Sequence, residues 1–189
     1  HFSLNADGSR SYDGVQVKRN AVFADAKGHW AQNAIGNTVA EGLFSSVTDT
    51  SFAPNTSATR GMLMTVLARY AGTDTTGGAT WYEKAMNWAK QTGVSDGTMP
   101  EVNITREQLA TMLYSYAKLK GLDTTQGGMA VREFNDYDSI SSWAGQSMTW
   151  AVNAGILSGR GNNTLAPTAG ATRAEMAVML QQFVGLMEK

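Results

Sequence analysis

Three arginines occur in the same sequence context, and a guanidinium in that context can bind an anion. Each directly follows a threonine at the start of a helical pattern, in the pairs Thr59-Arg60, Thr105-Arg106 and Thr172-Arg173. A cation at the first helical position opposes the helix dipole, so its recurrence needs an explanation. One explanation is an anion site, in which the guanidinium lies beside free backbone N–H groups and binds a carboxylate or phosphate. The other is a structural ion pair with an acidic residue of a neighbouring segment, and the residues alone leave both open.

The threonines are placed as helix caps. Thr172 is followed three residues later by Glu175, and Thr105 by Gln108, which is the capping-box pattern. Thr59 has Met62 at that position, so we expect only half of the box and a weaker cap there. Two aspartates precede other helical patterns, and we expect them to cap a helix or fix a turn: these are Asp25 and Asp136.

A second set of helical patterns begins with tryptophan and ends at glycine. The tryptophans are Trp30, Trp81 and Trp143, and the glycines twelve residues later are Gly42, Gly93 and Gly155. Glycine is the preferred residue just after a helix C-terminus. A tryptophan at a helix start can offer its ring to a sugar, or it can pack in the core, and both readings stay open for these three. For Trp88 and Trp150, which lie inside the helical stretches, we expect core packing.

The elements that must position these side chains share one apolar face. At 3, 6, 7 and 10 residues after each Arg the chain is apolar, and the residues are Leu63, Val66, Leu67 and Tyr70; Leu109, Met112, Leu113 and Tyr116; Met176, Met179, Leu180 and Phe183. This spacing predicts an amphipathic helix three times. Three such faces can bury one another. We therefore expect a mainly α fold of three tandem helix-loop-helix repeats, closing into a pseudo-threefold unit around a central three-helix bundle.

The predicted helices cover about 30–41, 59–71, 81–92, 106–120, 142–154 and 173–187, and the predicted repeats cover 22–72, 73–121 and 122–189. The loop from Gly to Arg is shorter in the second repeat, where it runs from 93 to 106, than in the others, where it runs from 42 to 60 and from 155 to 173. Residues 1–21 match no repeat and predict a short hairpin or the tail of a preceding domain.

These residues together resemble the S-layer homology (SLH) module, which occurs as three tandem copies in bacterial surface proteins. The Phe23-x-Asp25 and Phe134-x-Asp136 openings, the Trp, the helix-ending Gly and the Thr172-Arg173-Ala174-Glu175 box carry the resemblance, which covers about residues 22–187. It implies a secreted protein of the cell wall or S-layer, whose signal peptide is not in this chain. The implied function is non-covalent anchoring to secondary cell-wall polysaccharide, an anionic polymer typically carrying pyruvate ketals on N-acetylmannosamine.

The resemblance also implies where the ligand binds. Family clefts lie between adjacent repeats and are lined by the Thr-Arg motif of one repeat and residues of the next. The implied ligand-binding residues are Arg173, Arg60 and Arg106 with the three helix-opening tryptophans and the three glycines. Repeat three is the most complete, so the cleft of Arg173 is our first choice. Arg106 is expected to matter least, because the loop of its own repeat is shortened.

Composition and motifs exclude several other classes. Charged residues make up 16% of the chain and the net charge is −1, which argues against nucleic-acid binding. There is no cysteine, and no apolar run is long enough for a transmembrane helix. No nucleophile with a matched base, metal-ligand set or cofactor motif occurs, so we expect no enzyme, no cofactor and no metal. We expect a monomer with an internal pseudo-trimer.

A rival function from another class stays open. The same helical surface could serve a protein–protein adaptor that recognises an acidic peptide or partner surface. A hydrolase is a distant third, because it needs two carboxylates converging on one pocket, and no repeat supplies such a pair.

Overall fold

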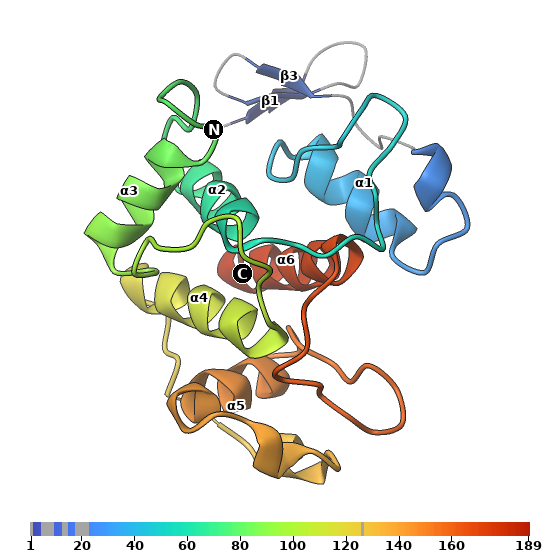
Figure 1. Ribbon diagram of the computed structural model, residues 1–189, viewed down its shortest axis with the longest axis vertical. Coiled ribbons are helices and arrows are strands. Elements are labelled where there is room, and N and C mark those ends of the chain that lie inside the picture. Colours follow the sequence, from blue (N-terminus) through green and yellow to red (C-terminus); the bar gives the residue numbers. More distant parts are fainter. Residues whose placement is uncertain (1, 5–9, 13–14, 18–22, 126) are drawn as a thin grey trace.

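The six main helices of the chain correspond to the six predicted segments. A computed structural model describes residues 2–4, 10–12, 15–17, 23–125 and 127–189, and Figure 1 shows it as a ribbon. The α-helices are α1 (Gln32–Ala40), α2 (Arg60–Tyr70), α3 (Glu83–Thr92), α4 (Arg106–Leu119), α5 (Gly145–Asn153) and α6 (Arg173–Met187). Short 3-10 turns are η1 (Ala24–Ala26), η2 (Ala130–Glu133), η3 (Tyr137–Ser139) and η4 (Ser142–Ala144). The fold class is therefore mainly α, as predicted.

A small antiparallel sheet precedes the helices. Its strands are β1 (Phe2–Leu4), β2 (Arg10–Tyr12) and β3 (Val15–Val17), in the order β1-β2-β3. Arg10 pairs with Val17 and Tyr12 with Val15, so β2 and β3 are adjacent antiparallel strands. The turns between the strands lie outside the described residues. Whether residues 1–21 are the tail of a preceding domain stays a prediction.

Local signals set the ends of the helices. The hydroxyls of Thr59, Thr105 and Thr172 each accept a hydrogen bond from the N–H three residues later, as an N-cap does. Gly42, Gly93 and Gly155 follow the Trp helices with φ of 75°, 80° and 78°. A left-handed residue at this place ends a helix, and glycine adopts it without the steric penalty of a Cβ.

The predicted apolar face is buried. Leu63, Leu109 and Met176, which share the first position of that face, are each 0% exposed. At its far end, the ring centroids of Tyr70 and Tyr116 are 5.8 Å apart, as are those of Tyr116 and Phe183. Helices α2, α4 and α6 therefore converge on one core.

We call α1, α3 and α5 the Trp helices, and α2, α4 and α6 the Thr-Arg helices. Each Trp helix packs mainly on the Thr-Arg helix of another repeat. Helix α3 packs on α2, and α5 packs on α4. Helix α1 packs on α6, which brings the first repeat against the last (Figure 1). The packing unit is thus offset from the sequence repeat, and the α1–α6 contact closes the arrangement.

A closed cycle of backbone hydrogen bonds joins the three segments that enter the Thr-Arg helices. The N–H of Ala58 donates to the carbonyl of Ala171, that of Ala171 to Ile104, and that of Ile104 to Ala58, each at 2.9 Å. In a threefold arrangement, a hydrogen bond between two of the three segments is repeated between the other pairs, which gives such a cycle. The pseudo-threefold symmetry itself stays a prediction, which this cycle supports.

Candidate functional site

The helix N-termini beside the three arginines are already occupied by the protein itself. The N–H of Arg173 donates to Thr56 O, and that of Ala174 to Pro54 O, both at 2.9 Å. The third N–H of this helix donates to the Thr172 hydroxyl. The other two helices repeat the pattern, with the pairs Arg60–Val102, Gly61–Pro100, Arg106–Ala169 and Glu107–Pro167. The free N–H groups that the anion hypothesis assumed are therefore absent from these three helices, and that part of it is wrong.

The arginine side chains cross from one repeat to the loop of the next. Arg60, Arg106 and Arg173 are 8%, 3% and 5% exposed. Their Nε atoms donate to backbone carbonyls at 3.2, 2.7 and 2.9 Å, and the acceptors are Thr98, Leu165 and Phe52 in that order. Each arginine thus joins two repeats. The ion pair with an acidic residue of a neighbouring segment, which the structural interpretation expected, is present for Arg60 and Arg106 but not, among the described residues, for Arg173.

This crossing corrects one expectation about the shortened loop. That loop contains Ser95, Asp96 and Thr98, and all three bind Arg60 rather than Arg106. Arg106 instead reaches the long loop of the third repeat. The reason for ranking Arg106 last was therefore wrong, because the arginine of each Thr-Arg pair donates to the loop of the next repeat and not to the loop of its own.

One pocket, which we call the Arg173 groove, has a volume of about 170 Å³ and is lined by residues of all three repeats. Its lining includes Phe44, Ser45, Met62, Arg69, Trp81 and Arg173. The Arg173 guanidinium lies over the rings of Phe44 and Phe52, 4.6 and 4.5 Å from their centroids. Such stacking stabilises a buried cation without neutralising it.

The acceptors of Arg173 are all uncharged. Nη2 donates to Ser45 O at 2.8 Å, Nε to Phe52 O, and Nη1 contacts Met62 Sδ at 3.5 Å. Among the described residues, no carboxylate forms an ion pair with Arg173. A thioether is a weak acceptor, so Nη1 is the least satisfied donor of this side chain.

A second guanidinium lines the same groove. Arg69 Nη1 donates to Ser45 Oγ at 2.8 Å, and its Nε donates to Thr75 Oγ1 at 3.2 Å. Burial lowers the pKa of both Arg69 and Arg173, and for Arg173 the charge of Asp25 works against this lowering. Both side chains stay protonated, because arginine does not lose its proton in proteins. The groove therefore holds two partly desolvated positive charges.

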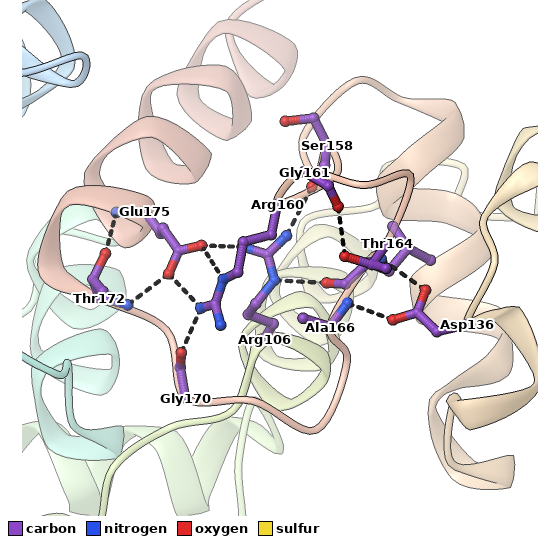
Figure 2. A network of polar contacts seen from close by, with 11 residues as sticks. Arg106, Asp136, Ser158, Arg160, Gly161, Thr164, Ala166, Gly170, Thr172 and Glu175 are labelled. Carbon is purple, nitrogen blue, oxygen red and sulfur yellow. Dashed lines mark hydrogen bonds and ion pairs between the residues drawn. The ribbon is translucent and has the colours of Figure 1, made fainter.

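A second pocket, which we call the Arg106 groove, has a volume of about 600 Å³. Its lining includes Trp30, Asn55, Arg106, Arg160 and Glu175. Figure 2 shows Glu175 held between the two arginines. Its carboxylate accepts from Arg106 Nη1, from Arg160 Nε at 3.0 Å and Nη2 at 2.6 Å, and from the Thr172 N–H at 3.0 Å.

These contacts decide the charge of Glu175. Burial by itself would raise the pKa of this carboxyl, but hydrogen bonds from Arg160 and Thr172, and the positive charges of Arg106 and Arg160, outweigh it and lower the pKa. Burial lowers the pKa of Arg106, while the charge of Glu175 raises it. In this groove the buried arginine is neutralised from within the chain.

The third arginine has an exposed partner. Arg60 Nη2 forms an ion pair with Asp96 at 3.0 Å, and the Asp96 side chain is 63% exposed. Hydrogen bonds from the Thr98 N–H and hydroxyl lower the pKa of Asp96. The three arginines therefore have three different partners: an exposed aspartate, a buried glutamate and no carboxylate.

The tryptophans divide as their positions suggested. Trp30, Trp81 and Trp143 are 68%, 53% and 57% exposed, whereas Trp150 is 3% exposed and Trp88 packs against the core. Trp81 lines the Arg173 groove and Trp30 the Arg106 groove. Trp143 lines neither of these two. An exposed tryptophan thus accompanies a buried arginine in both grooves.

The glycines and aspartates act on the loops that form the groove walls. Gly42, Gly93 and Gly155 do not line the two grooves, but segments that follow Gly42 and Gly155 do. Asp25 accepts from the N–H groups of Phe52 and Ala53 at 2.9 and 2.8 Å, which lower its pKa. Asp136 does the same for Leu165 and Ala166, at 2.8 Å each. Both aspartates therefore hold the distant loop before the Thr-Arg helix, not a cap or a turn next to themselves.

Two groove residues carried no signal in the sequence. Arg69 and Arg160 have no counterpart in the other repeats, where Ser115 and Gln182 stand in the place of Arg69. Comparison of the repeats therefore could not find them. Within the described ranges, no group of three acidic or histidine side chains could hold a metal ion, and no helix is both long and apolar enough to cross a membrane.

Comparison with known proteins places the chain in a family. The model of the S-layer homology domain matches residues 22–61 and 133–177. The chain is 31% identical over 183 residues to an amylopullulanase of Thermoanaerobacterium thermosulfurigenes, covering 89% of this chain and 10% of that protein. It is 29% identical over 188 residues to the exoglucanase XynX of Acetivibrio thermocellus, covering 92% of this chain and 17% of that protein.

A solved structure is also similar, the undecaheme cytochrome from the S-layer of Carboxydothermus ferrireducens, with 21% identity and a TM-score of 0.47 over 70% of this chain and 18% of that one. We draw no argument from that likeness. The two segments matched by the family model contain the Phe-x-Asp openings and two of the three Thr-Arg motifs described above. The chain therefore belongs to the S-layer homology family.

Proposed function

We propose that this chain anchors a surface protein to the bacterial cell wall by binding an anionic secondary cell-wall polysaccharide in grooves between repeats. The coarse part of this function, cell-wall anchoring at the bacterial cell surface, follows from the family. The ligand, a polymer with pyruvate ketals on N-acetylmannosamine, is the finer part of the proposal.

The observation that carries the ligand is the content of the Arg173 groove. It combines a buried guanidinium that has no carboxylate partner in the described chain with an exposed tryptophan, Trp81. A pyruvylated sugar offers a carboxylate for the guanidinium and an apolar C–H face for the indole ring. Charge-assisted hydrogen bonds of this kind are the stronger ones in proteins.

The chain contributes anchoring and no catalysis in this proposal. It spans 10% and 17% of the two curated relatives described above, whose printed names are those of enzymes. We infer that any enzymatic activity of a parent protein lies outside this chain. We further propose that the three repeats cover 22–72, 73–121 and 122–189 and that the chain is a monomer.

Sedimentation with purified cell-wall sacculi tests the function. We expect the chain to co-sediment with sacculi that carry acidic polymer, and to remain in the supernatant after that polymer has been removed. Binding should weaken as salt rises, because a groove open to water is screened. Equal binding to both preparations would reject the proposed ligand. Binding that appears only when a wall protein is added would favour the adaptor alternative.

Calorimetric titration tests the site. Arg173→Ala should weaken binding of a pyruvylated disaccharide at least about tenfold, the factor that a lost charge-assisted contact can supply. Arg173→Lys should restore part of the affinity, because it keeps the charge but not the planar fork. Circular dichroism verifies that each variant is folded, and parent-like affinity in folded Arg173→Ala would refute the role of this arginine.

A further inference from the structure

We propose that Met62 determines which groove accepts an acidic sugar, by leaving Arg173 without a carboxylate partner in the described part of the chain. The Arg173 groove is then the preferred groove for the acidic group, because in the Arg106 groove Glu175 already pairs with both arginines. This inference rests on the proposed function, because it specifies where the acidic group of that ligand binds.

Met62 and Glu175 occupy the same place in their repeats. Each is the third residue after the Thr cap of its helix, and each contacts Nη1 of the arginine from the preceding repeat. In one groove that nitrogen meets a thioether at 3.5 Å, and in the other it meets a carboxylate. One side chain thus changes the partner of the same guanidinium nitrogen from neutral to negative.

The electrostatic consequence differs between the grooves. Glu175 is fixed by Arg106, Arg160 and the Thr172 N–H, and its side chain is 11% exposed. A ligand carboxylate entering there meets two arginines that are both already paired with Glu175, and the buried negative charge of Glu175 between them. Like charges in a partly desolvated site repel strongly.

In the Arg173 groove an incoming carboxylate meets the opposite situation. Arg69 and Arg173 both line this groove. Asp25 is the carboxylate whose charge acts on Arg173, but its oxygens accept hydrogen bonds from the N–H groups of Phe52 and Ala53 and not from Arg173. Burial of Arg173 disfavours its charge. A ligand carboxylate on Nη1 would compensate a buried cation that no carboxylate of the described residues pairs with. This is favourable because a buried charge without a partner is costly.

Met62→Glu is the decisive variant because it should change stability and binding in opposite directions. The structure already closes the capping box of Thr59 through the weak Met62 Sδ contact, so the sequence expectation of half a box was wrong. The new carboxylate can replace that contact with a charged one and pair with Arg173, so the melting temperature should rise. Binding of the pyruvylated disaccharide should weaken at least about tenfold, since the internal carboxylate now competes for the guanidinium. Met62→Gln adds a polar group of the same shape without the charge, and should weaken binding by a much smaller factor.

Gln108→Glu is the matched control. It adds the same negative charge at the same place of the second repeat, where the capping box is already complete. Its affinity for the acidic sugar should equal that of the parent. If Gln108→Glu weakens binding as much as Met62→Glu, the effect is one of net charge and the inference fails.

The remaining outcomes separate this inference from the proposed function. Sacculi binding by the parent together with undiminished binding of acidic sugar and sacculi by Met62→Glu would overturn the role of Met62 and leave the function intact. Weaker binding with a lower melting temperature would also overturn it, because damage to the fold would then be the cause. A parent that does not bind sacculi would instead reject the proposed function.

Discussion

The Arg173 groove and the Arg106 groove are built at equivalent junctions of the chain, and each is lined by two arginines, but only the Arg106 groove also holds a carboxylate that pairs with them. Both place a buried arginine of one repeat against the loop of the next, and both have an exposed tryptophan in the lining. In the Arg106 groove the arginine meets Glu175, and in the Arg173 groove it meets Met62. The comparison teaches that equally buried arginines at equivalent places can have a charged or a neutral partner, depending on a single residue, and we propose that the one with the neutral partner binds the ligand.

The difference predicts that stability and binding separate between the two arginines. Removing Arg106 leaves part of a buried ion pair behind, whereas removing Arg173 leaves only neutral acceptors behind. The first arginine should therefore matter more for folding, and the second more for ligand binding.

The largest effect is expected for Arg106→Ala. Breaking a buried ion pair by removing one partner costs about 3–5 kcal/mol of unfolding free energy, and Arg160 remains to neutralise Glu175, so we expect the lower end of this range. Arg173→Ala should cost about 1–3 kcal/mol, because it orphans only backbone carbonyls. Urea unfolding of both variants measures this, and an equal or larger loss for Arg173→Ala would break the comparison.

Truncating equivalent core residues of α2, α4 and α6, the helices that support both grooves, should lower the free energy of unfolding by similar amounts. Leu67, Leu113 and Leu180 occupy the same place on α2, α4 and α6 and are 0%, 0% and 1% exposed. Truncating each to Ala should cost about 2–5 kcal/mol through lost burial and the cavity left behind. Denaturant melts give the three values. If one of the three Leu→Ala variants lost almost no free energy of unfolding, the three helices would not contribute equivalently to the core beneath the grooves.

Acid should loosen the Arg106 groove first. The pKa of Glu175 is lowered in the folded chain, so this carboxyl stabilises the fold above its ordinary pKa of 4.5 and loses that contribution as pH falls through the lowered folded value. Glu175→Gln removes this dependence, so its stability should fall less steeply than that of the parent between about pH 5 and pH 3. Thermal melts across that range test the slope, and parallel curves would contradict it. Asp25 and Asp136, whose pKa values are also lowered, supply the acid sensitivity that remains.

The smallest effect concerns the caps that present Met62 and Glu175. Thr172→Ala should cost about 1 kcal/mol through the lost N-cap. Thr59→Ala should cost less, because the N–H of Thr59 meets only Met62 Sδ, at 3.5 Å, where that of Thr172 meets a carboxylate. Chemical denaturation of the two variants compares them, and equal losses would show that the sulfur contact completes the box as well as a carboxylate does.

The amino-acid sequence by itself determined the helices, their caps and the buried face. These features depend on neighbours within a few residues: a hydroxyl bonded to the N–H three positions on, a left-handed glycine, and an apolar side chain on every turn. The positions of Trp30, Trp81 and Trp143 and the difference between Met62 and Glu175 were also visible in the aligned repeats, but the exposure of the three tryptophans was not. Such local patterns do not indicate which repeats contact one another.

The tertiary structure alone decided the partners of the arginines. Arg173 and Ser45 are 128 residues apart in the chain, and Arg106 and Glu175 are 69 apart. These pairs meet because α1 packs on α6 and because each Thr-Arg helix abuts the proline loop of another repeat, where its N–H groups find carbonyl acceptors. Both arginines are buried there, and the partner that each one meets, Glu175 or Met62, then separates an arginine paired within its own chain from one without a carboxylate partner among the described residues.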